Sequence, residues 1–199
     1  MLTSPSFHLD HRDWVRVLRL QSEDGTNRLT QVAVLALTGE IRALASEPIP
    51  LVITGNQRFF SAGAELREIA ALRGPGAYEF SKVGQTLMRQ VEQFPAPVYA
   101  AVSGYCMGGG LDLALACHRR FAARNAVLGH RGAALGLITG WGGTQRLTRL
   151  VGKAASLQMF LVAEKINAQR ALEMGLVQSV CDDPVGEAIR ILKCSRSGS

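Results

Sequence analysis

Two short apolar segments, each ending in glycine, constrain the fold of this chain more than any other feature. They are residues 50–55 (PLVITG) and 97–104 (PVYAAVSG). Apolar runs of this length and composition are typical of strands buried on both faces. Between them, apolar residues recur at helical spacing over residues 78–94. A strand, a helix and a second strand in this order favour parallel pairing through a right-handed crossover, so we expect an α/β fold.

The rest of the chain alternates between strand and helix patterns. Strands are expected at residues 15–20, which alternate apolar with polar side chains like a half-buried strand, and around residues 121–128. Helices are expected at residues 30–45, 111–117, from about 143 onward, 154–162, 168–173 (with Gly175 as C-cap) and, as one short helix at most, 184–193. The length of 199 residues fits one domain spanning residues 1–199, with residues 195–199 as a disordered tail.

Charge and cysteine usage exclude several functional classes. The net charge is +6, but the basic residues are scattered, His118-Arg119-Arg120 is the one compact cluster, and aromatic residues make up only 6%. We therefore expect no nucleic-acid binding, whereas anionic small molecules suit the charge. The four cysteines have no CxxC spacing or nearby histidine pair, which predicts free thiols and no metal site. The amino terminus is too polar for a signal peptide and no apolar run reaches ~20 residues, so we expect a cytoplasmic protein that does not enter membranes.

Two glycine-containing turns follow the two buried segments and are candidate binding elements. They are residues 61–66 (SAGAEL) and 103–113 (SGYCMGGGLDL). Glycine lets the main chain turn sharply and approach a ligand, and the free N–H groups at a helix start favour negative charge. Two such amides can form an oxyanion hole, which binds an oxygen that becomes negative during a reaction. Glycines here also suit tight helix–strand packing, but a third glycine-rich turn into a helix, residues 140–147 (GWGGTQRL), accompanies them.

The order of these motifs resembles the enoyl-CoA hydratase/isomerase, or crotonase, family. The resemblance covers roughly residues 15–180 and is carried by residues 25–30 (GTNRLT), 53–55 (ITG), 61–64 (SAGA), 97–104, 108–110 (GGG), 142–147 (GGTQRL) and 171–177 (ALEMGLV). It implies a crotonase-like spiral of ββα repeats, with two roughly perpendicular sheets wrapped by helices. It also implies a homo-oligomer, a trimer or dimer of trimers, and an acyl-CoA substrate whose coenzyme A is part of the substrate, with no separate cofactor.

The resemblance assigns the oxyanion hole to the backbone amides of Ala64 and Gly109, which would hold the thioester oxygen as an enolate forms. It implies that five further residues line the coenzyme A and acyl channel: Ala62, Leu66, Gly108, Gly132 and Leu135. Glu65 directly follows the oxyanion alanine, but an acidic residue in the first turn of a helix is the simpler interpretation of it.

The chain departs from the family at both of its catalytic acids. Hydratases of the family use two glutamates as a general acid–base pair. The first position is Asp112, whose shorter side chain would set the carboxylate back by about 1 Å, and a helix-start acid is the alternative interpretation. The second position falls at Gly132, which has no carboxylate. His130 or Arg131 could substitute, although a structural or solvent-facing role suits both better, since neither occupies the matching position.

We therefore expect an acyl-CoA-transforming enzyme of the enoyl-CoA hydratase/isomerase type, which stabilises an enolate in an oxyanion hole. Gly132 counts against hydration and against any isomerisation that needs the second glutamate. Other reactions of the family keep the oxyanion hole and vary the acid and base. A catalytically silent acyl-CoA-binding or assembly subunit is the alternative. The chain is short for the family at its C-terminal end, so the contacts to the adenine and phosphates of coenzyme A are not mapped, and we expect association to cover exposed apolar surface.

Overall fold

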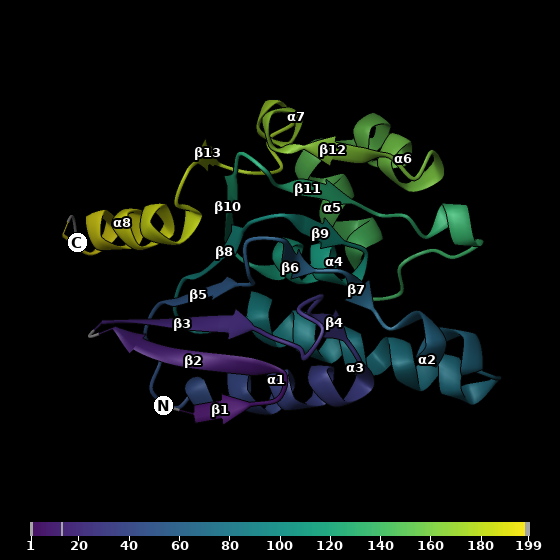
Figure 1. The fold of residues 1–199 in the computed structure, drawn as a ribbon, viewed down its shortest axis with the longest axis horizontal. Helices are drawn as coiled ribbons and strands as arrows, with labels where there is room; N and C mark the ends of the chain where they lie inside the picture. Colours follow the sequence, from purple (N-terminus) through teal and green to yellow (C-terminus); the bar gives the residue numbers. More distant parts are fainter. Residues whose placement is uncertain (1, 13, 198–199) are drawn as a thin grey trace.

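The computed structural model describes residues 2–12 and 14–197 (Figure 1). Their strands form a larger sheet of order β1-β2-β3-β5-β8-β10-β13, a smaller sheet of order β12-β11-β9-β6, and the pair β4-β7. The larger sheet contains β1 (Leu2–Ser4), β2 (Phe7–Arg12), β3 (Val15–Leu20), β5 (Leu51–Thr54), β8 (Val98–Val102), β10 (Arg119–Ala123) and β13 (Ser179–Cys181). The other strands are β4 (Arg28–Leu29), β6 (Phe59–Ser61), β7 (Gly63–Ala64), β9 (Tyr105–Met107), β11 (Val127–Gly129) and β12 (Lys165–Asn167).

Helices cover both faces of the larger sheet. They are α1 (Gln31–Leu44), α2 (Leu66–Ala71), α3 (Pro75–Glu92), α4 (Gly109–Ala116), α5 (Gly143–Val151), α6 (Lys153–Leu161), α7 (Ala168–Glu173), α8 (Pro184–Ser197) and the single 3₁₀ turn η1 (Ala133–Leu135). In Figure 1, α1 and α3 run below the sheet and α8 lies at its left end, beside β13. The C-cap of α7 is Met174, and Gly175 follows it with a φ of +72°, close to the expected helix end.

The two glycine-ended segments form neighbouring parallel strands, which confirms the expectation from their sequence. β5 pairs in parallel with β8, with Val52 opposite Tyr99, and α3 lies between the two strands in the chain. Alternate side chains of these strands enter different cores: Leu51 and Ile53 join the core with α1 and α3, whereas Val52 joins a second core under α8. Burial on both faces is the reason for the unbroken apolar run.

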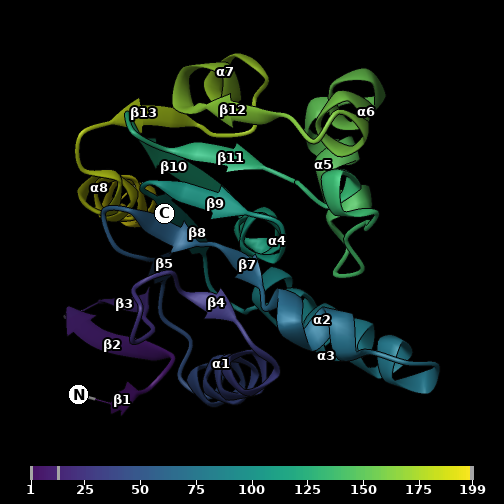
Figure 2. The same cartoon turned by 45° about the vertical axis from the view of Figure 1, so that its right-hand side comes forward.

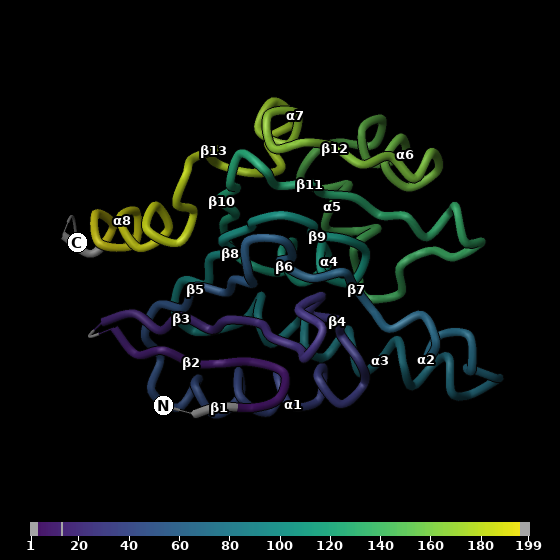
Figure 3. The backbone as a smooth tube through the Cα atoms, viewed as in Figure 1, coloured from purple at the N-terminus to yellow at the C-terminus, as the bar shows by residue number. Residues whose placement is uncertain are grey.

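The spiral of ββα repeats expected from the resemblance is present. β5, β8 and β10 lie in the larger sheet, and the strands that follow them, β6, β9 and β11, lie in the smaller one. Helical segments follow β9 and β11 before the chain returns to a sheet. Figures 2 and 3 show this winding, with the chain passing repeatedly from one sheet to the other.

Several local expectations need correction. β3 is buried on both faces rather than half-buried, because Val15 and Val17 join the second core and buried Arg16 donates to the carbonyl of Glu47 at 2.7 Å. A turn at residues 124–126 divides the strand expected near residues 121–128 into β10 and β11. α8 extends to Ser197, so residues 195–197 of the expected disordered tail are helical, because the helix docks on β8 and β10. Residues 198–199 of that tail lie outside the described part.

Candidate active site

The glycine-rich turn before α4 sets the position of the Gly109 amide. Gly108 caps the helix with a φ of +51°, a conformation that suits glycine, and its N–H donates to the carbonyl of Gly129 at 2.9 Å. The first helical bond of α4 runs from the N–H of Asp112 to the carbonyl of Gly108 at 3.0 Å. Gly109 is the first residue of the helix, so its N–H has no acceptor one turn earlier.

The other glycine-containing turn, at β7, lies directly against this helix start. A methyl group on the Cα of Gly109 would lie 3.3 Å from the amide nitrogen of Ala64. One on the Cα of Gly63 would lie 3.2 Å from the nitrogen of Gly109 and 2.6 Å from the carbonyl oxygen of Met107. The backbones therefore meet without intervening side chains. The two amides that the sequence singles out are neighbours.

The side chains of Asn27 and Ser61 hold β7 in place through hydrogen bonds. Buried Asn27 has a φ of +53°, which asparagine tolerates better than most residues, and its Nδ2 donates to the carbonyl of Phe59 at 2.9 Å. The hydroxyl of Ser61 donates to the carbonyl of Asn27 at 2.7 Å and accepts from the N–H of Gly63 at 3.1 Å. Asn27 and Ser61 lie within motifs that carry the resemblance, but the sequence gives no direct sign of this contact.

Trp141 closes the other side of Gly109. Its ring is buried, contacts Gly84 of α3, and would lie 2.5 Å from a methyl group on Gly109. The ring Nε1 donates to the carbonyl of Phe80 at 3.3 Å, and the Phe80 and Trp141 rings pack with centroids 5.3 Å apart. The indole thus fills the space that side chains at positions 84 and 109 would occupy, and it ties the third glycine-rich turn to α3 and α4.

Asp112 lies one turn after Gly109 on α4, and its side chain is 0% exposed. Its Oδ2 accepts a hydrogen bond from the hydroxyl of Thr139, and its Oδ1 lies 3.3 Å from Nε2 of His130. That pair lacks the alignment of a hydrogen bond, and within residues 2–12 and 14–197 neither atom has another partner. Gly143, the first residue of α5, packs against the same Oδ1.

Burial shifts the ionisation of both groups in opposite directions. Desolvation raises the pKa of Asp112 to about 7, although the Thr139 hydrogen bond and the charge of Arg146 oppose the rise. Desolvation lowers the pKa of His130 to about 4. At neutral pH the histidine is therefore uncharged, while the carboxyl of Asp112 is divided between its acid and base forms. A group in this state can both give and take a proton.

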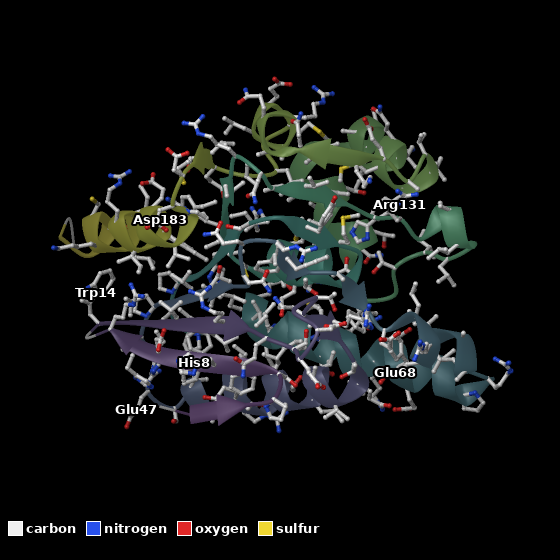
Figure 4. All side chains as sticks on the ribbon, in the orientation of Figure 1. His8, Trp14, Glu47, Glu68, Arg131 and Asp183 are labelled. Atoms are coloured by element: carbon white, nitrogen blue, oxygen red, sulfur yellow. The ribbon has the colours of Figure 1, made fainter. Side chains whose placement is uncertain are left out.

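The position of the missing second carboxylate is closed. Gly132 caps η1, and a methyl group on its Cα would lie 2.6 Å from the carbonyl oxygen of Leu137. Of its two neighbours, His130 is buried against Asp112 and against the ring of Phe160, with centroids 4.9 Å apart. Arg131 is exposed, and Figure 4 labels it between α6 and η1. The solvent-facing interpretation thus fits Arg131, whereas His130 contacts the candidate acid.

Two of the predicted channel residues are exposed. Leu66 is 51% exposed at the start of α2, and Leu135 is 56% exposed in η1. Ala62 is half-buried, and its N–H donates to the carbonyl of Thr26 at 2.9 Å. The carboxylate of Glu65 accepts from the N–H of Arg67 at 3.1 Å and caps α2, which confirms the helix-start interpretation of this residue.

Thr139 is the residue of this cluster that the sequence did not single out. It precedes the third glycine-rich turn, and only the fold brings its hydroxyl to Asp112, 27 residues away in the chain. In the described ranges, no three His, Cys, Asp or Glu side chains are grouped so as to hold a metal ion. None of the helices in these ranges is both long and apolar enough to cross a bilayer.

Comparison with known proteins gives consistent matches over this fold. A "Probable enoyl-CoA hydratase" of Bacillus subtilis is 46% identical over 128 residues, which are 64% of this chain and 50% of the relative. A "Crotonyl-CoA hydratase" of Syntrophomonas wolfei is 37% identical over 86% of this chain and 67% of its own length. This chain therefore spans only about half the length of the first relative.

Solved structures agree with the sequence matches. Pseudomonas aeruginosa DspI superimposes with a TM-score of 0.93 at 31% identity, over 98% of this chain and 82% of that one. Enoyl-CoA hydratase of Bacillus anthracis superimposes with a TM-score of 0.89 at 34% identity, over 94% of this chain and 75% of that one. The model of the enoyl-CoA hydratase/isomerase family matches residues 14–192. The chain belongs to the enoyl-CoA hydratase/isomerase family.

Proposed function

We propose that this chain is an acyl-CoA-transforming enzyme that moves a proton at the α-carbon of a thioester through an enolate. The proposed oxyanion hole consists of the amides of Ala64 and Gly109, and the proposed acid–base group is Asp112. One observation carries the proposal: the two amides are neighbours, and a buried carboxyl with a pKa near 7 lies one turn away on the same helix. The names of the two relatives, both hydratases that include CoA in their description, support a coenzyme A thioester as substrate.

The chemistry needs a stabilised negative oxygen and a nearby proton acceptor. Loss of an α-proton, which ends on the carboxylate of Asp112, leaves an enolate, whose charge resides on the thioester oxygen. Amides that are fixed before the reaction stabilise that charge without reorganising, and one such donor contributes about 3 kcal/mol to lowering the barrier. Return of the proton to the α-carbon, or to the γ-carbon of an unsaturated chain, restores the thioester carbonyl.

Proton transfer suits this site better than addition of water. Hydration by the family's two-glutamate route needs a second carboxylate, and Gly132 supplies none. The carbonyl of Leu137 fills the space into which a side chain at position 132 would project. Hydration of an enoyl-CoA is the second candidate function, because both relatives are named as hydratases.

The test is deuterium incorporation into the α-carbon of butyryl-CoA in D₂O, measured by mass spectrometry. We expect incorporation well above the buffer blank, and a loss of about 100-fold or more in Asp112→Asn. Asp182→Asn is the matched control, since Asp182 is exposed and pairs with Arg124 away from the site. If crotonyl-CoA instead loses its enoyl-thioester absorbance without α-exchange of butyryl-CoA, hydration replaces the proposal.

The same assays address the silent alternative. Calorimetric binding of butyryl-CoA with neither exchange nor hydration would establish an acyl-CoA-binding subunit. Absence of binding to any coenzyme A thioester would refute the proposal altogether.

We also propose a homo-oligomer, a trimer or dimer of trimers. Large apolar side chains are exposed along η1, the segment after it, and α6: Leu135, Ile138, Leu157, Leu161 and Val162. A patch of this kind commonly marks an interface between proteins. Sedimentation equilibrium tests the proposal, and a monomer at micromolar concentration would refute it. The cytoplasmic location and the absence of a nucleic-acid partner stay predictions.

A further inference from the structure

The burial of Asp112 poses a problem for the proposed function. Its side chain is 0% exposed, so no acyl group can touch the carboxylate in this conformation. Its side chain is also one methylene shorter than the glutamate of the family, which sets the carboxylate back by about 1 Å from where a glutamate would place it. A proton therefore needs an intermediate group to pass between Asp112 and a substrate.

Thr139 has the chemistry and the position of such a group. Its hydroxyl donates to Oδ2 of Asp112, and Thr139 is only partly buried, on the exposed segment between η1 and α5. The same hydroxyl oxygen accepts from the N–H of Trp141 at 3.3 Å, which fixes its orientation. A hydroxyl gives one proton while it accepts another, so it can pass a proton without ever carrying a charge. An O–H···O contact extends the reach of the carboxylate by about 2.7 Å.

The other neighbours of Asp112 favour transfer of the proton through Oδ2 and Thr139. Oδ1 faces His130, which burial keeps uncharged at neutral pH, and packs against Gly143. Cys106 of β9 and Arg146 of α5 are the remaining ionisable groups that interact electrostatically with the carboxyl among the described residues. The oxygen that Thr139 holds is Oδ2, whereas His130 and Gly143 face Oδ1.

We propose that Thr139 is a catalytic residue that relays the proton between Asp112 and the acyl α-carbon. The inference rests on the proposed function. In the protonating direction, the Oγ1–H bond of Thr139 breaks and its proton forms the new C–H bond with the electron pair of the enolate double bond. The thioester C=O re-forms as the oxyanion charge returns. At the same time Oγ1 takes the proton from Oδ2, so the hydroxyl is restored and Asp112 is left as the carboxylate. Deprotonation is the reverse.

The experiment compares Thr139→Val, which keeps the shape but removes the hydroxyl, with Thr139→Ser, which keeps the hydroxyl. Deuterium exchange into butyryl-CoA is measured from pH 5 to 10 for the full chain, together with butyryl-CoA binding by calorimetry. Two quantities are extracted: the maximal rate on the plateau and the pH of half-maximal rate. Thr148→Val is the matched control, because Thr148 is a partly buried threonine on α5 whose hydroxyl bonds to Thr144 and Ser156.

The maximal exchange rate on the plateau distinguishes a proton relay from a role in which Thr139 only shifts the pKa of Asp112. The Thr139 hydrogen bond lowers the pKa of Asp112, so its loss raises that pKa and moves the half-maximal pH upward whichever role is correct. A relay also predicts that the Thr139→Val plateau falls about 100-fold with binding unchanged, while Thr139→Ser and Thr148→Val keep most of the rate.

A Thr139→Val plateau equal to that of the unaltered chain would overturn the relay while leaving the proposed function intact. A plateau that falls equally in Thr139→Ser would overturn it too, since the hydroxyl is then not the group that matters. If the unaltered chain shows no exchange, the proposed function fails and this inference fails with it.

Discussion

Gly109→Ala is the substitution that most sharply tests the packing around the two amides. The added methyl group would lie 2.5 Å from Cζ3 and 2.8 Å from Cε3 of the Trp141 ring, and 3.3 Å from the amide nitrogen of Ala64. Carbon atoms in contact prefer about 3.5–4.0 Å, so either the indole or the start of α4 has to move. The indole is held on its far side by Gly84 and by its bond to the carbonyl of Phe80.

Two effects with separate magnitudes follow. Overpacking of this kind lowers the free energy of unfolding by about 1–3 kcal/mol. Displacement of one donor from an oxyanion hole slows the reaction by about 100-fold, equivalent to about 3 kcal/mol of barrier. We therefore expect Gly109→Ala to reduce both the urea midpoint and the rate of α-deuterium exchange into butyryl-CoA.

The control is the same substitution in a Trp141→Leu background, which removes the ring that the methyl group meets. There we expect Gly109→Ala to have little effect on the urea midpoint, because the clash is gone. It should still slow exchange, because the methyl group remains beside the nitrogen of Ala64. An exchange rate that Gly109→Ala leaves unchanged in this background would refute the assignment of the Gly109 amide to the oxyanion hole.

Three further predictions concern the acid–base groups and the core. Gly132→Glu should lower the melting temperature without creating crotonyl-CoA hydration, because its Cβ would lie 2.6 Å from the carbonyl oxygen of Leu137; a gain of hydration contradicts this. The pKa of His130 falls from 6.5 in the unfolded chain to about 4 in the folded protein. The pKa of Asp112 rises from 3.8 in the unfolded chain to about 7 in the folded protein. Between about pH 4 and 6.5 the two groups change the free energy of unfolding with pH in opposite directions. Asp112→Asn should therefore lose up to about 1.4 kcal/mol of unfolding free energy per pH unit as pH falls through that window, and His130→Gln should lose a similar amount as pH rises. Urea titrations in which both variants match the unaltered chain would contradict these opposite pKa shifts. Arg120→Leu should lower the free energy of unfolding by about 3 kcal/mol, because this buried guanidinium donates to backbone carbonyls beside α4 and β13, and an unchanged urea midpoint would contradict that.

The sequence predicts those elements whose burial is evident from the pattern of apolar residues within the element itself. β5 and β8 are apolar along their whole length because both faces are covered, and α3 shows its buried stripe at helical spacing. The pattern of β3 wrongly predicts a half-buried strand because Arg16 has the character of a solvent-facing residue, whereas its guanidinium donates to the carbonyls of Leu44 and Glu47, at and after the end of α1. Such a contact joins residues about thirty positions apart and leaves no local pattern.

Some features of the candidate site are likewise evident in the sequence, and others arise only from the fold. Glycines at positions 63 and 109 are visible in the sequence because only a residue without a side chain permits the close approach of β7 to α4, and the glycine at position 108 suits the positive φ of the helix cap. The resemblance to the family is what assigns the first catalytic acid to Asp112. Its bond to Thr139 and its contact with His130 depend on the path of the segment between β11 and α5, which the fold alone determines.

The most direct test of the oxyanion hole is the ¹³C NMR shift of the thioester carbonyl in [1-¹³C]butyryl-CoA bound to the Asp112→Asn variant, which should bind without turnover. Two amide donors polarise a carbonyl, so we expect a downfield shift on binding that is diminished by Gly109→Ala. Binding with the carbonyl shift of free butyryl-CoA would contradict the assignment of Ala64 and Gly109 as the groups that hold the enolate.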